Sequence, residues 1–400
     1  MSLPIKEIPA EIKKLLSFYK RLFTRPQYKN FRDFVFGLIV SDNKTVQEIN
    51  DCFGRVDQSS LNRFLTLSGW DPVKINNKRI SQIKSSNKIT KGIFISDPTF
   101  LQKFGKMMEY ANYHYSGMTK KIEWGYFLVN CFFTNGNVEF PICADFYLRE
   151  EDADAEHPFR TVRELCIAQL DYAMKRLPIW LFIADSGLYA DFLIRDLRSR
   201  GLKYILGARV TNKISINGKK RISIEDYLKT LTDDDFEIHI LDGEAYFLHT
   251  IDISERHVGK EKLLISYKAG DEENIRVNVT NLMQHKDRAT LSLLLERWKI
   301  ETWHRDAKQH LGLEDCQMRN FGAIQKVVCA ILVAHTQLIL MKKATLLKPL
   351  NRILTTIGEG CRYLRLIALK GTFWLKQKAK DIAEFRKILN QQVFVKNAKV

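Results

Sequence analysis

Apolar residues recur at two different spacings along the chain, and the spacing changes near Lys91. Before that point Ile12, Leu15, Leu16 and Tyr19 follow a helical period, which predicts helices over residues 5–70. After it come short apolar runs of the kind that form buried strands, such as GIFISD at residues 92–97. The pattern therefore predicts a helical domain over residues 1–70 followed by an α/β domain.

The remaining stretches complete the predicted organisation. Residues 71–90 are rich in Lys, Asn and Ser and are expected to form a basic linker. Strand, hairpin, helix, strand, helix and strand patterns follow in turn over residues 91–210, which predicts a mixed sheet whose parallel members are covered by helices. Residues 211–290 predict a β-rich insertion, residues 291–340 the last core helices, and residues 341–400 a basic helical region.

Two buried strands of the α/β region each end on a carboxylate. GIFISD ends on Asp97, and PIWLFIADSG at residues 178–187 carries Asp185 directly after its apolar run. If the two strands are parallel neighbours, both carboxylates lie at the sheet edge where open α/β sheets bind ligands. Asp at such a position also caps the following turn, so a purely local role stays open.

The stretch from Leu294 to Leu313 reads LLERWKIETWHRDAKQHLGL and predicts one continuous helix. In such a helix Leu294, Arg297, Glu301 and Lys308 fall within roughly 60° of one another. Glu301 could then hold a hard cation between a guanidinium and an ammonium that meet anionic groups. A solvated helix face with ordinary ion pairs gives the same pattern, and the stretch alone does not separate the two interpretations.

Residues 44–65 have the spacing of a helix-turn-helix, with Gly54 at the turn and Asp57 or Ser59 as the cap of a second helix. That second helix presents Gln58, Asn62 and Arg63 at the end that usually reaches base edges. Many short helical hairpins bind nothing, so DNA contact by these three residues is a hypothesis.

Charge strengthens the hypothesis of a polyanionic partner. The net charge of the 400 residues is +17, of which residues 1–90 carry +8 and residues 341–400 carry +11, so the centre is nearly neutral at −2. Two basic ends suit contacts with nucleic-acid phosphates. The seven cysteines show no zinc-binding spacing and fit reduced thiols in the cytoplasm. No signal peptide is recognisable, and the longest apolar run, Val327 to Met341, is expected to be a core helix rather than a membrane span.

Three blocks of the sequence carry a resemblance to a known family. The pattern L-x-x-R-W-x-I-E-x-x-x-x-x-x-K from Leu294 to Lys308 resembles the Y-R-E-K signature of bacterial insertion-sequence transposases of the DDE type. IADSGLYADFLIRDLRSRG resembles the second-Asp block of that family, and ISDPTFLQK resembles the first. With the preceding helices and the β-rich insertion, the similarity extends over about residues 1–340.

The resemblance implies an RNase H-like catalytic core built on a mixed five-stranded sheet. It implies an endonuclease that performs cut-and-paste transposition as a homodimer on paired terminal inverted repeats of double-stranded DNA, and that inserts them into target DNA. Asp97, Asp185 and Glu301 would hold two Mg²⁺ or Mn²⁺ ions, and Arg297 and Lys308 would contact phosphates near the cut. Trp298 would lie at the DNA as in relatives, although packing on its helix is an equal alternative.

The chain departs from the family pattern at two places. Leu294 stands where the signature has Tyr, so one phosphate hydrogen bond must be absent or supplied elsewhere. Relatives stack a flipped base on an aromatic residue of the insertion, which here has no Trp, so Tyr246 or Phe247 would take that role. Two other functions stay open: a DNA-binding regulator derived from a transposase, and an RNase H-like nuclease without strand transfer.

Overall fold

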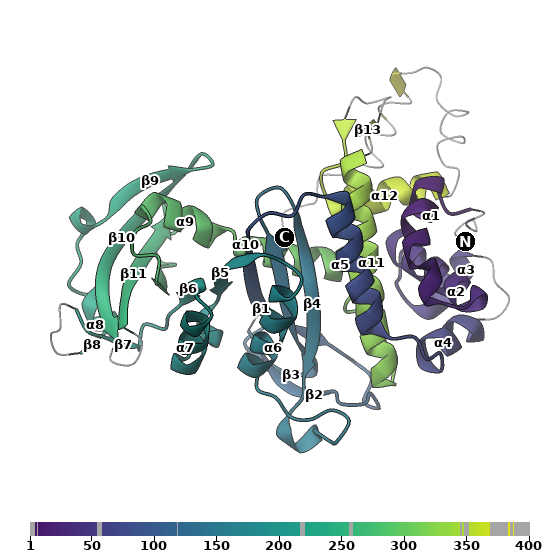
Figure 1. Ribbon diagram of the computed structural model, residues 1–400, viewed down its shortest axis with the longest axis horizontal. Helices are drawn as coiled ribbons and strands as arrows, with labels where there is room; N and C mark the ends of the chain where they lie inside the picture. Colours follow the sequence, from purple (N-terminus) through teal and green to yellow (C-terminus); the bar gives the residue numbers. More distant parts are fainter. Residues whose placement is uncertain are drawn as a thin grey trace. The chain divides into compact units, whose positions relative to one another are not determined.

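The computed structural model describes most of the chain in two compact units (Figure 1). The described residues are 5, 7–53, 58–117, 119–216, 221–255, 259–344, 346–347, 352–368, 383–384 and 387. The first unit comprises residues 1–88, 100–126 and 303–400, and the second comprises residues 89–99 and 127–302. The chain passes from one unit to the other within strands β1 and β3 and within helix α10.

The second unit is built on a mixed sheet whose central five strands run in the order β4–β3–β1–β5–β6. These strands are β1 (Gly92–Gln102), β3 (Lys121–Thr134), β4 (Glu139–Tyr147), β5 (Ile179–Ala184) and β6 (Lys203–Gly207). β5 pairs in parallel with both β1 and β6, whereas β3 and β4 form an antiparallel hairpin. The RNase H-like mixed core predicted from the sequence is confirmed.

The three parallel strands are apolar on both faces, as strands covered on both sides of a sheet are. Phe94 and Ile95 of β1 and Phe182 and Ile183 of β5 have no exposed surface. The Phe94 and Phe182 rings stack with centroids 5.4 Å apart. This packing fixes the relative height of β1 and β5, because a slip of one residue would turn these rings to the other face.

The insertion extends the same sheet with antiparallel strands. β12 (Arg276–Thr280) pairs with β6, and β11 (Gly259–Lys268), β10 (Glu244–Glu255) and β9 (Glu237–Leu241) follow outward. Asp242 and Gly243, both with positive φ, form the two-residue turn between β9 and β10, as expected for an Asp-Gly hairpin. The stretch expected to be β-rich also holds the short strands β7 (Lys213–Ile214) and β8 (Ile222–Ser223) and helix α8 (Ile224–Leu228).

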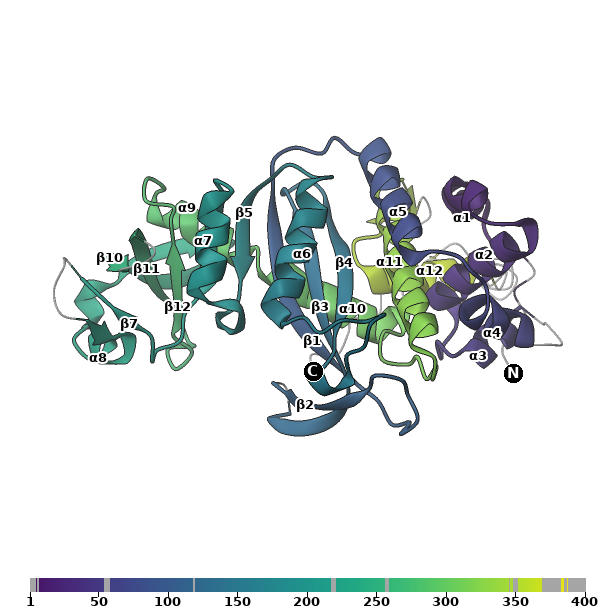
Figure 2. The same ribbon diagram turned by 60° about the horizontal axis from the view of Figure 1, so that its bottom comes forward.

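Helices pack on the core sheet and link its strands. α6 (Val162–Met174) begins with a capping box between Thr161 and Glu164. Its Gln169 side-chain amide donates to the Val129 carbonyl of β3 (2.9 Å) and to Asp145 of β4 (2.7 Å), and α6 runs along these strands in Figures 1 and 2. α7 (Asp191–Ser199) leads into β6, and α9 (Asp287–Leu295) and α10 (Trp298–Leu311) follow β12.

The first unit is a helical assembly around α11 (Phe321–Ala344). α1 (Ala10–Leu16), α2 (Arg25–Val40), α4 (Ser59–Thr66), α5 (Pro72–Ser86) and α12 (Ile357–Ala368) pack against it, and α3 (Val46–Cys52) packs on α2. Residues 321–341 are long and apolar enough to cross a membrane, but 83% of that window is buried inside the structure. α11 is therefore a core helix, and no membrane protein is indicated.

The structure has a helix where the sequence analysis expected a linker over residues 71–90. Asp71 accepts hydrogen bonds from the amides of Val73 and Lys74, Pro72 opens α5, and Ile80 is buried where α5 lies beside α11 in Figures 1 and 2. The high Lys, Asn and Ser content concealed this helical spacing of isoleucines. Residues 1–88 thus pack with α11 in one unit instead of forming a domain of their own. The expected C-terminal region, residues 341–400, lies largely outside the described residues.

Replacing Ile80 tests this assignment of α5. Ile80→Ala should lower the free energy of unfolding by about 2–4 kcal/mol, because it leaves a cavity where the side chain of Ile80 is buried. Lys74→Ala, at an exposed position of the same helix, should change it by less than about 0.5 kcal/mol. The measurement is urea denaturation followed by circular dichroism. Equal, negligible effects would mean that residues 71–90 are a linker after all.

Candidate active site

Asp97 and Asp185 lie at the same height in the core sheet. Asp97 lies within β1, which continues to Gln102, so the prediction that this strand ends on Asp97 is wrong, whereas Asp185 directly follows the last residue of β5. Ser96 of β1 is in register with Ala184 of β5. Asp97 directly follows Ser96, and Asp185 directly follows Ala184. Because β1 and β5 are parallel, the two carboxylates leave the sheet side by side. The parallel arrangement assumed in the sequence analysis is therefore present.

Asp185 is held by its own turn and by a neighbouring glycine. Its Oδ1 accepts a hydrogen bond from the Ser186 amide (2.7 Å), so the local capping role considered for it is also real. A Cβ atom on Gly207, the last residue of β6, would lie 2.5 Å from the Ser186 nitrogen and 3.0 Å from Asp185 Oδ1. Only a residue without a side chain allows β6 to approach this turn so closely.

The predicted continuous helix from Leu294 to Leu313 is interrupted. α9 ends at Leu295 and α10 begins at Trp298, so Leu294 and Arg297 do not lie on one helical face with Glu301 as predicted. Hydrogen bonds of the i+3 type, such as that from the Arg297 amide to the Leu294 carbonyl (3.1 Å), tighten the chain between the two helices. Lys299 links this turn to β4, because its ammonium forms ion pairs with Glu296 of the turn (2.8 Å) and with Glu139 of β4 (3.1 Å).

Arg297 and Glu301 nevertheless form a close pair. Arg297 Nη2 lies 2.8 Å from Glu301 Oε1, and both side chains are partly shielded from solvent. The ordinary i,i+4 ion pair considered for this stretch is thus present, and both of its members act electrostatically on Asp97.

The three carboxylates influence one another electrostatically. The pKa of Asp97 is raised to about 7, mainly because the carboxyl is buried; the negative charges of Asp185 and Glu301 add to the rise, and Arg297 opposes it. The pKa of Glu301 is also raised, first by burial and to a smaller extent by Asp185, whereas Arg297 and Arg276 lower it. Crowded carboxylates with raised pKa values mark a place where a positive charge would be bound favourably.

Arg276 and Trp298 border the carboxylates. The Arg276 guanidinium lies over the Trp298 ring at 4.5 Å from its centroid, and that of Arg297 lies at 5.3 Å. Trp298 is still 41% exposed, so part of its side chain remains accessible to a ligand. Sequence reasoning missed Arg276, whose only signal is its place at the start of the buried strand β12 that adjoins β6.

A pocket of about 190 Å³ opens beside Trp298, between the insertion strands and α9. Tyr246, Tyr267, Lys268 and Arg276 are among the residues that line it. Phe247 is not among its lining residues and stacks on Tyr267 with ring centroids 4.9 Å apart. Of the two aromatic residues suggested for base stacking, Tyr246 is thus the one in the pocket with Trp298.

Lys308 lies in the first unit and is engaged within it. Its ammonium donates to the Phe100 carbonyl (2.8 Å) and pairs with Glu314 (2.7 Å). A phosphate contact by Lys308 therefore requires its pair with Glu314 to open or to be shared.

The predicted base-reading residues lie on the surface of the helical unit. Gln58, Asn62 and Arg63 are exposed, while α4 packs inward through Leu61 and Phe64. Residues 54–57, which include the expected turn glycine and one of the two expected caps, lie outside the described residues.

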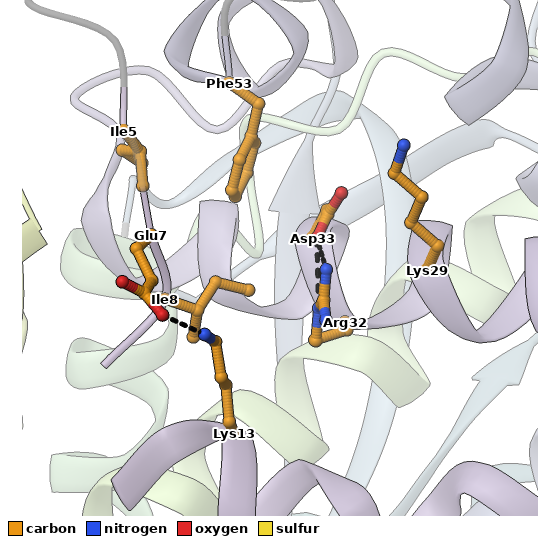
Figure 3. Close-up of a pocket in the computed structure, with 8 residues that line it drawn as sticks. All are labelled: Ile5, Glu7, Ile8, Lys13, Lys29, Arg32, Asp33 and Phe53. Atoms are coloured by element: carbon orange, nitrogen blue, oxygen red, sulfur yellow. Dashed lines mark hydrogen bonds and ion pairs between the residues drawn. The ribbon is translucent and has the colours of Figure 1, made fainter. Parts of the chain in front are cut away.

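Near these helices a hollow of about 400 Å³ is lined by three cations, Lys13, Lys29 and Arg32 (Figure 3). Two of them are already neutralised, Lys13 by Glu7 and Arg32 by Asp33. The hollow therefore offers an anion one uncompensated ammonium, that of Lys29, among its lining residues.

The donor set at the sheet edge fits a hard divalent cation in its chemistry. Mg²⁺ and Mn²⁺ prefer carboxylate oxygens, and Asp97, Asp185 and Glu301 supply them together. Among the described residues no three His, Cys, Asp or Glu side chains stand close enough to share an ion, and Arg297 occupies one oxygen of Glu301. Metal binding at these residues thus requires side-chain movement, in which Glu301 leaves Arg297.

Comparison with known proteins gives two matches. A family model described as "Transposase DDE domain" matches residues 93–337, which is more than half of the chain. The "Probable transposase for insertion sequence element IS701" of Microchaete diplosiphon is 29% identical over 220 residues, covering 53% of this chain and 56% of that protein. The chain thus spans about half the length of this curated relative.

Substituting Gly207 tests how the Asp185 turn is held. Gly207→Ala should lower the free energy of unfolding by about 1–3 kcal/mol, because the new methyl group collides with backbone atoms of residues 185 and 186. Gly187→Ala adds the same group two residues from Asp185, where nothing lies within 4 Å, and should stay within about 0.5 kcal/mol of the parent protein. Thermal unfolding measures both, and equal stability of the two variants would contradict the close approach of β6.

Proposed function

Because the chain belongs to the family of transposase DDE domains, we propose that it is a transposase that cleaves DNA at the ends of an insertion sequence and joins them to target DNA. The observation that carries this proposal is the parallel pairing of β1 with β5, which sets Asp97 beside Asp185 and within electrostatic reach of Glu301. Members of this family generally use divalent metal ions.

In the proposed mechanism Asp97, Asp185 and Glu301 hold two Mg²⁺ or Mn²⁺ ions. Such ions would activate the attacking oxygen and stabilise the leaving oxygen of an in-line displacement at phosphorus. The raised pKa of Asp97 reflects repulsion and burial that a bound cation would offset. Arg297, released from Glu301, would turn its guanidinium to the phosphate at the cut, where a bidentate contact orients the reacting group.

Trp298 and Tyr246 would receive a base displaced from the DNA next to the cut. Both line one pocket, and the exposed Trp298 ring offers a surface for stacking. Arg276 and Lys268 line the same pocket and would contact the phosphates on either side of that base. This arrangement supports the role that the family resemblance assigns to Trp298.

Recognition of the ends is proposed for the helical region. Gln58, Asn62 and Arg63 would reach base edges from the N-terminal part of α4, and the basic ends of the chain would supply phosphate contacts. Two copies of the protein would act in the cytoplasm on paired terminal inverted repeats, as the family resemblance implies. The three intact carboxylates weigh against a regulator that has lost its catalytic core.

Replacing Glu301 tests the catalytic assignment. Glu301→Gln should abolish Mg²⁺-dependent cleavage of a labelled transposon end, because the neutral amide removes the negative charge needed for a metal ligand. End binding should change by no more than a few fold, since the basic ends are untouched. The control is Glu225→Gln, which neutralises an exposed carboxylate of α8 that also pairs with a cation four residues away, Lys229 (3.2 Å), and which should still cleave.

Two results would contradict the proposal. Turnover at the parent rate in Glu301→Gln would remove Glu301 from the catalytic group. Cleavage of any DNA without end sequence, and without joining to target DNA, would identify a nuclease instead of a transposase.

Replacing Lys308 gives a second test, which measures binding to transposon ends and not their cleavage. Lys308→Ala should weaken binding to transposon ends and reduce the slope of log K against log salt by roughly one, as expected for the loss of one phosphate contact. Lys203→Ala, at an exposed position of β6, is the matched loss of one charge and should leave the slope unchanged. An unchanged slope for Lys308→Ala would mean that Lys308 serves only its internal pair with Glu314.

A further inference from the structure

A two-stranded ribbon of the first unit presents an aromatic face that nothing in the proposed function uses. It consists of β2 (Asn112–Ser116) and the start of β3, and Figure 2 shows the two strands side by side. Tyr113 pairs with Trp124 and Tyr115 pairs with Ile122 across the strands. Directly opposed residues of an antiparallel pair share a face, as do alternate residues of a strand, so all four side chains lie on one face.

The other face of the ribbon is occupied by the end of β1. A Cβ atom on Gly125 would lie 2.1 Å from the Leu101 carbonyl oxygen, so the strands are in close contact there. The Gln102 side chain donates to Glu123 (3.3 Å), and the Phe100 ring lies 6.3 Å from that of His114. The ribbon is therefore supported from one side, and the aromatic face points away from that support.

The aromatic face is strongly exposed. Tyr113, Tyr115 and Ile122 have 53%, 58% and 70% of their surface accessible. The adjoining loop adds Phe104 at 79% and Met107 at 73%. That loop lies against the ribbon, because the Trp124 indole donates to the Gly105 carbonyl (2.9 Å). A continuous exposed apolar patch of this kind marks an interaction surface.

Two lysines border the patch. Lys106 in the loop and Lys120 before β3 are exposed and have no acidic partner in the described part of the chain. Lys121 and Glu123 alternate with Ile122 and Trp124, so they belong to the opposite face of the ribbon. Glu109 accepts only from the neutral amides of Asn320 and Phe321 and keeps its charge, so the two ammonium groups outnumber one carboxylate and the border favours an anionic partner.

The chemistry of the partner follows from the combination of rings and ammonium groups. Open aromatic rings flanked by lysines bind single-stranded nucleic acid, because bases stack on the rings and phosphates meet the charges. A second copy of the chain fits less well, because a two-fold contact through this face would set Lys106 and Lys120 against the same lysines.

We propose that the ribbon face of Tyr113, Tyr115, Ile122 and Trp124, with its border of Lys106 and Lys120, binds a DNA strand whose bases are unstacked. Such a strand arises wherever DNA is opened around a cut, so the proposal rests on the proposed function for its biological setting. The binding itself requires no cleavage and no metal ion.

Fluorescence anisotropy of the full-length protein with a labelled oligothymidine, longer than a typical single-strand site of about 4–16 nucleotides, tests the proposal in EDTA. Replacing both tyrosines, Tyr113→Ala with Tyr115→Ala, should raise the Kd about tenfold or more, as the loss of two stacking rings predicts. Tyr113→Phe with Tyr115→Phe keeps both rings and should stay within about twofold.

Two controls make the result specific. Ile238→Ala with Ile240→Ala removes exposed apolar side chains from alternate positions of β9 and should leave the Kd unchanged. Blunt duplex DNA of the same length should bind the Tyr113→Ala, Tyr115→Ala variant about as well as the parent, because its bases are already stacked. Circular dichroism confirms that each variant is folded.

The lysine border is tested separately. Lys106→Ala with Lys120→Ala should reduce the salt slope of oligothymidine binding by about 1.4, at about 0.7 per phosphate contact on a single strand. An unchanged slope would remove the border from the proposed surface.

The proposal would be overturned by an unchanged Kd in the Tyr113→Ala, Tyr115→Ala variant. It would also be overturned if that variant lost only a dimer detected by light scattering, which would assign the face to a second copy. Asp97→Asn separates the two proposals, because it should stop cleavage yet leave oligothymidine binding intact. Strand binding through the ribbon without cleavage in the parent protein would refute the proposed function alone.

Discussion

The parallel pairing of β1 with β5 is the constraint on which the candidate site depends. Buried apolar rings on both strands fix the register that matches Ser96 with Ala184, and the next residue of each strand is an aspartate. Two carboxylates that are 88 positions apart in the sequence therefore lie side by side, in surroundings that raise the pKa of Asp97 to about 7. Burial is the largest cause of this rise and the negative charges of Asp185 and Glu301 add to it, so a cation bound beside these carboxylates would be favourable.

Two arginines partly offset the repulsion between the three carboxylates. Arg297 pairs with Glu301 and lowers the pKa of both Glu301 and Asp97, while Arg276 acts on Glu301 from the insertion strand β12. The break between α9 and α10 places Arg297 in a turn anchored by Lys299, so its guanidinium is not tied to a regular helical face. A guanidinium in this position can exchange a carboxylate partner for a phosphate when a cation takes over the carboxylates.

The two strands and the closeness of their aspartates could be predicted from the sequence, because short apolar runs followed by a charged residue are typical of buried strands, although β1 continues past Asp97 to Gln102. The helix break could not be predicted, since every residue from Leu294 to Ile300 is compatible with a helix and the contact of Lys299 with Glu139 of β4 exists only in the folded chain. The linker prediction was wrong at α5, because a high Lys, Asn and Ser content conceals the helical spacing of isoleucines that are buried. Arg276 and the ribbon of Tyr113 and Tyr115 carry no motif, and their roles appear only once the strands are paired.

The central claim is that Asp97, Asp185 and Glu301 together bind divalent cations. The most direct measurement loads the protein with Fe²⁺ in place of Mg²⁺, adds ascorbate and peroxide, and maps the resulting backbone cuts by mass spectrometry. The account predicts three groups of cuts, close to residues 97, 185 and 301, all suppressed by excess Mg²⁺ and lost together in Asp185→Asn. Cuts confined to one of these segments, or unchanged cutting in Asp185→Asn, would contradict a shared site.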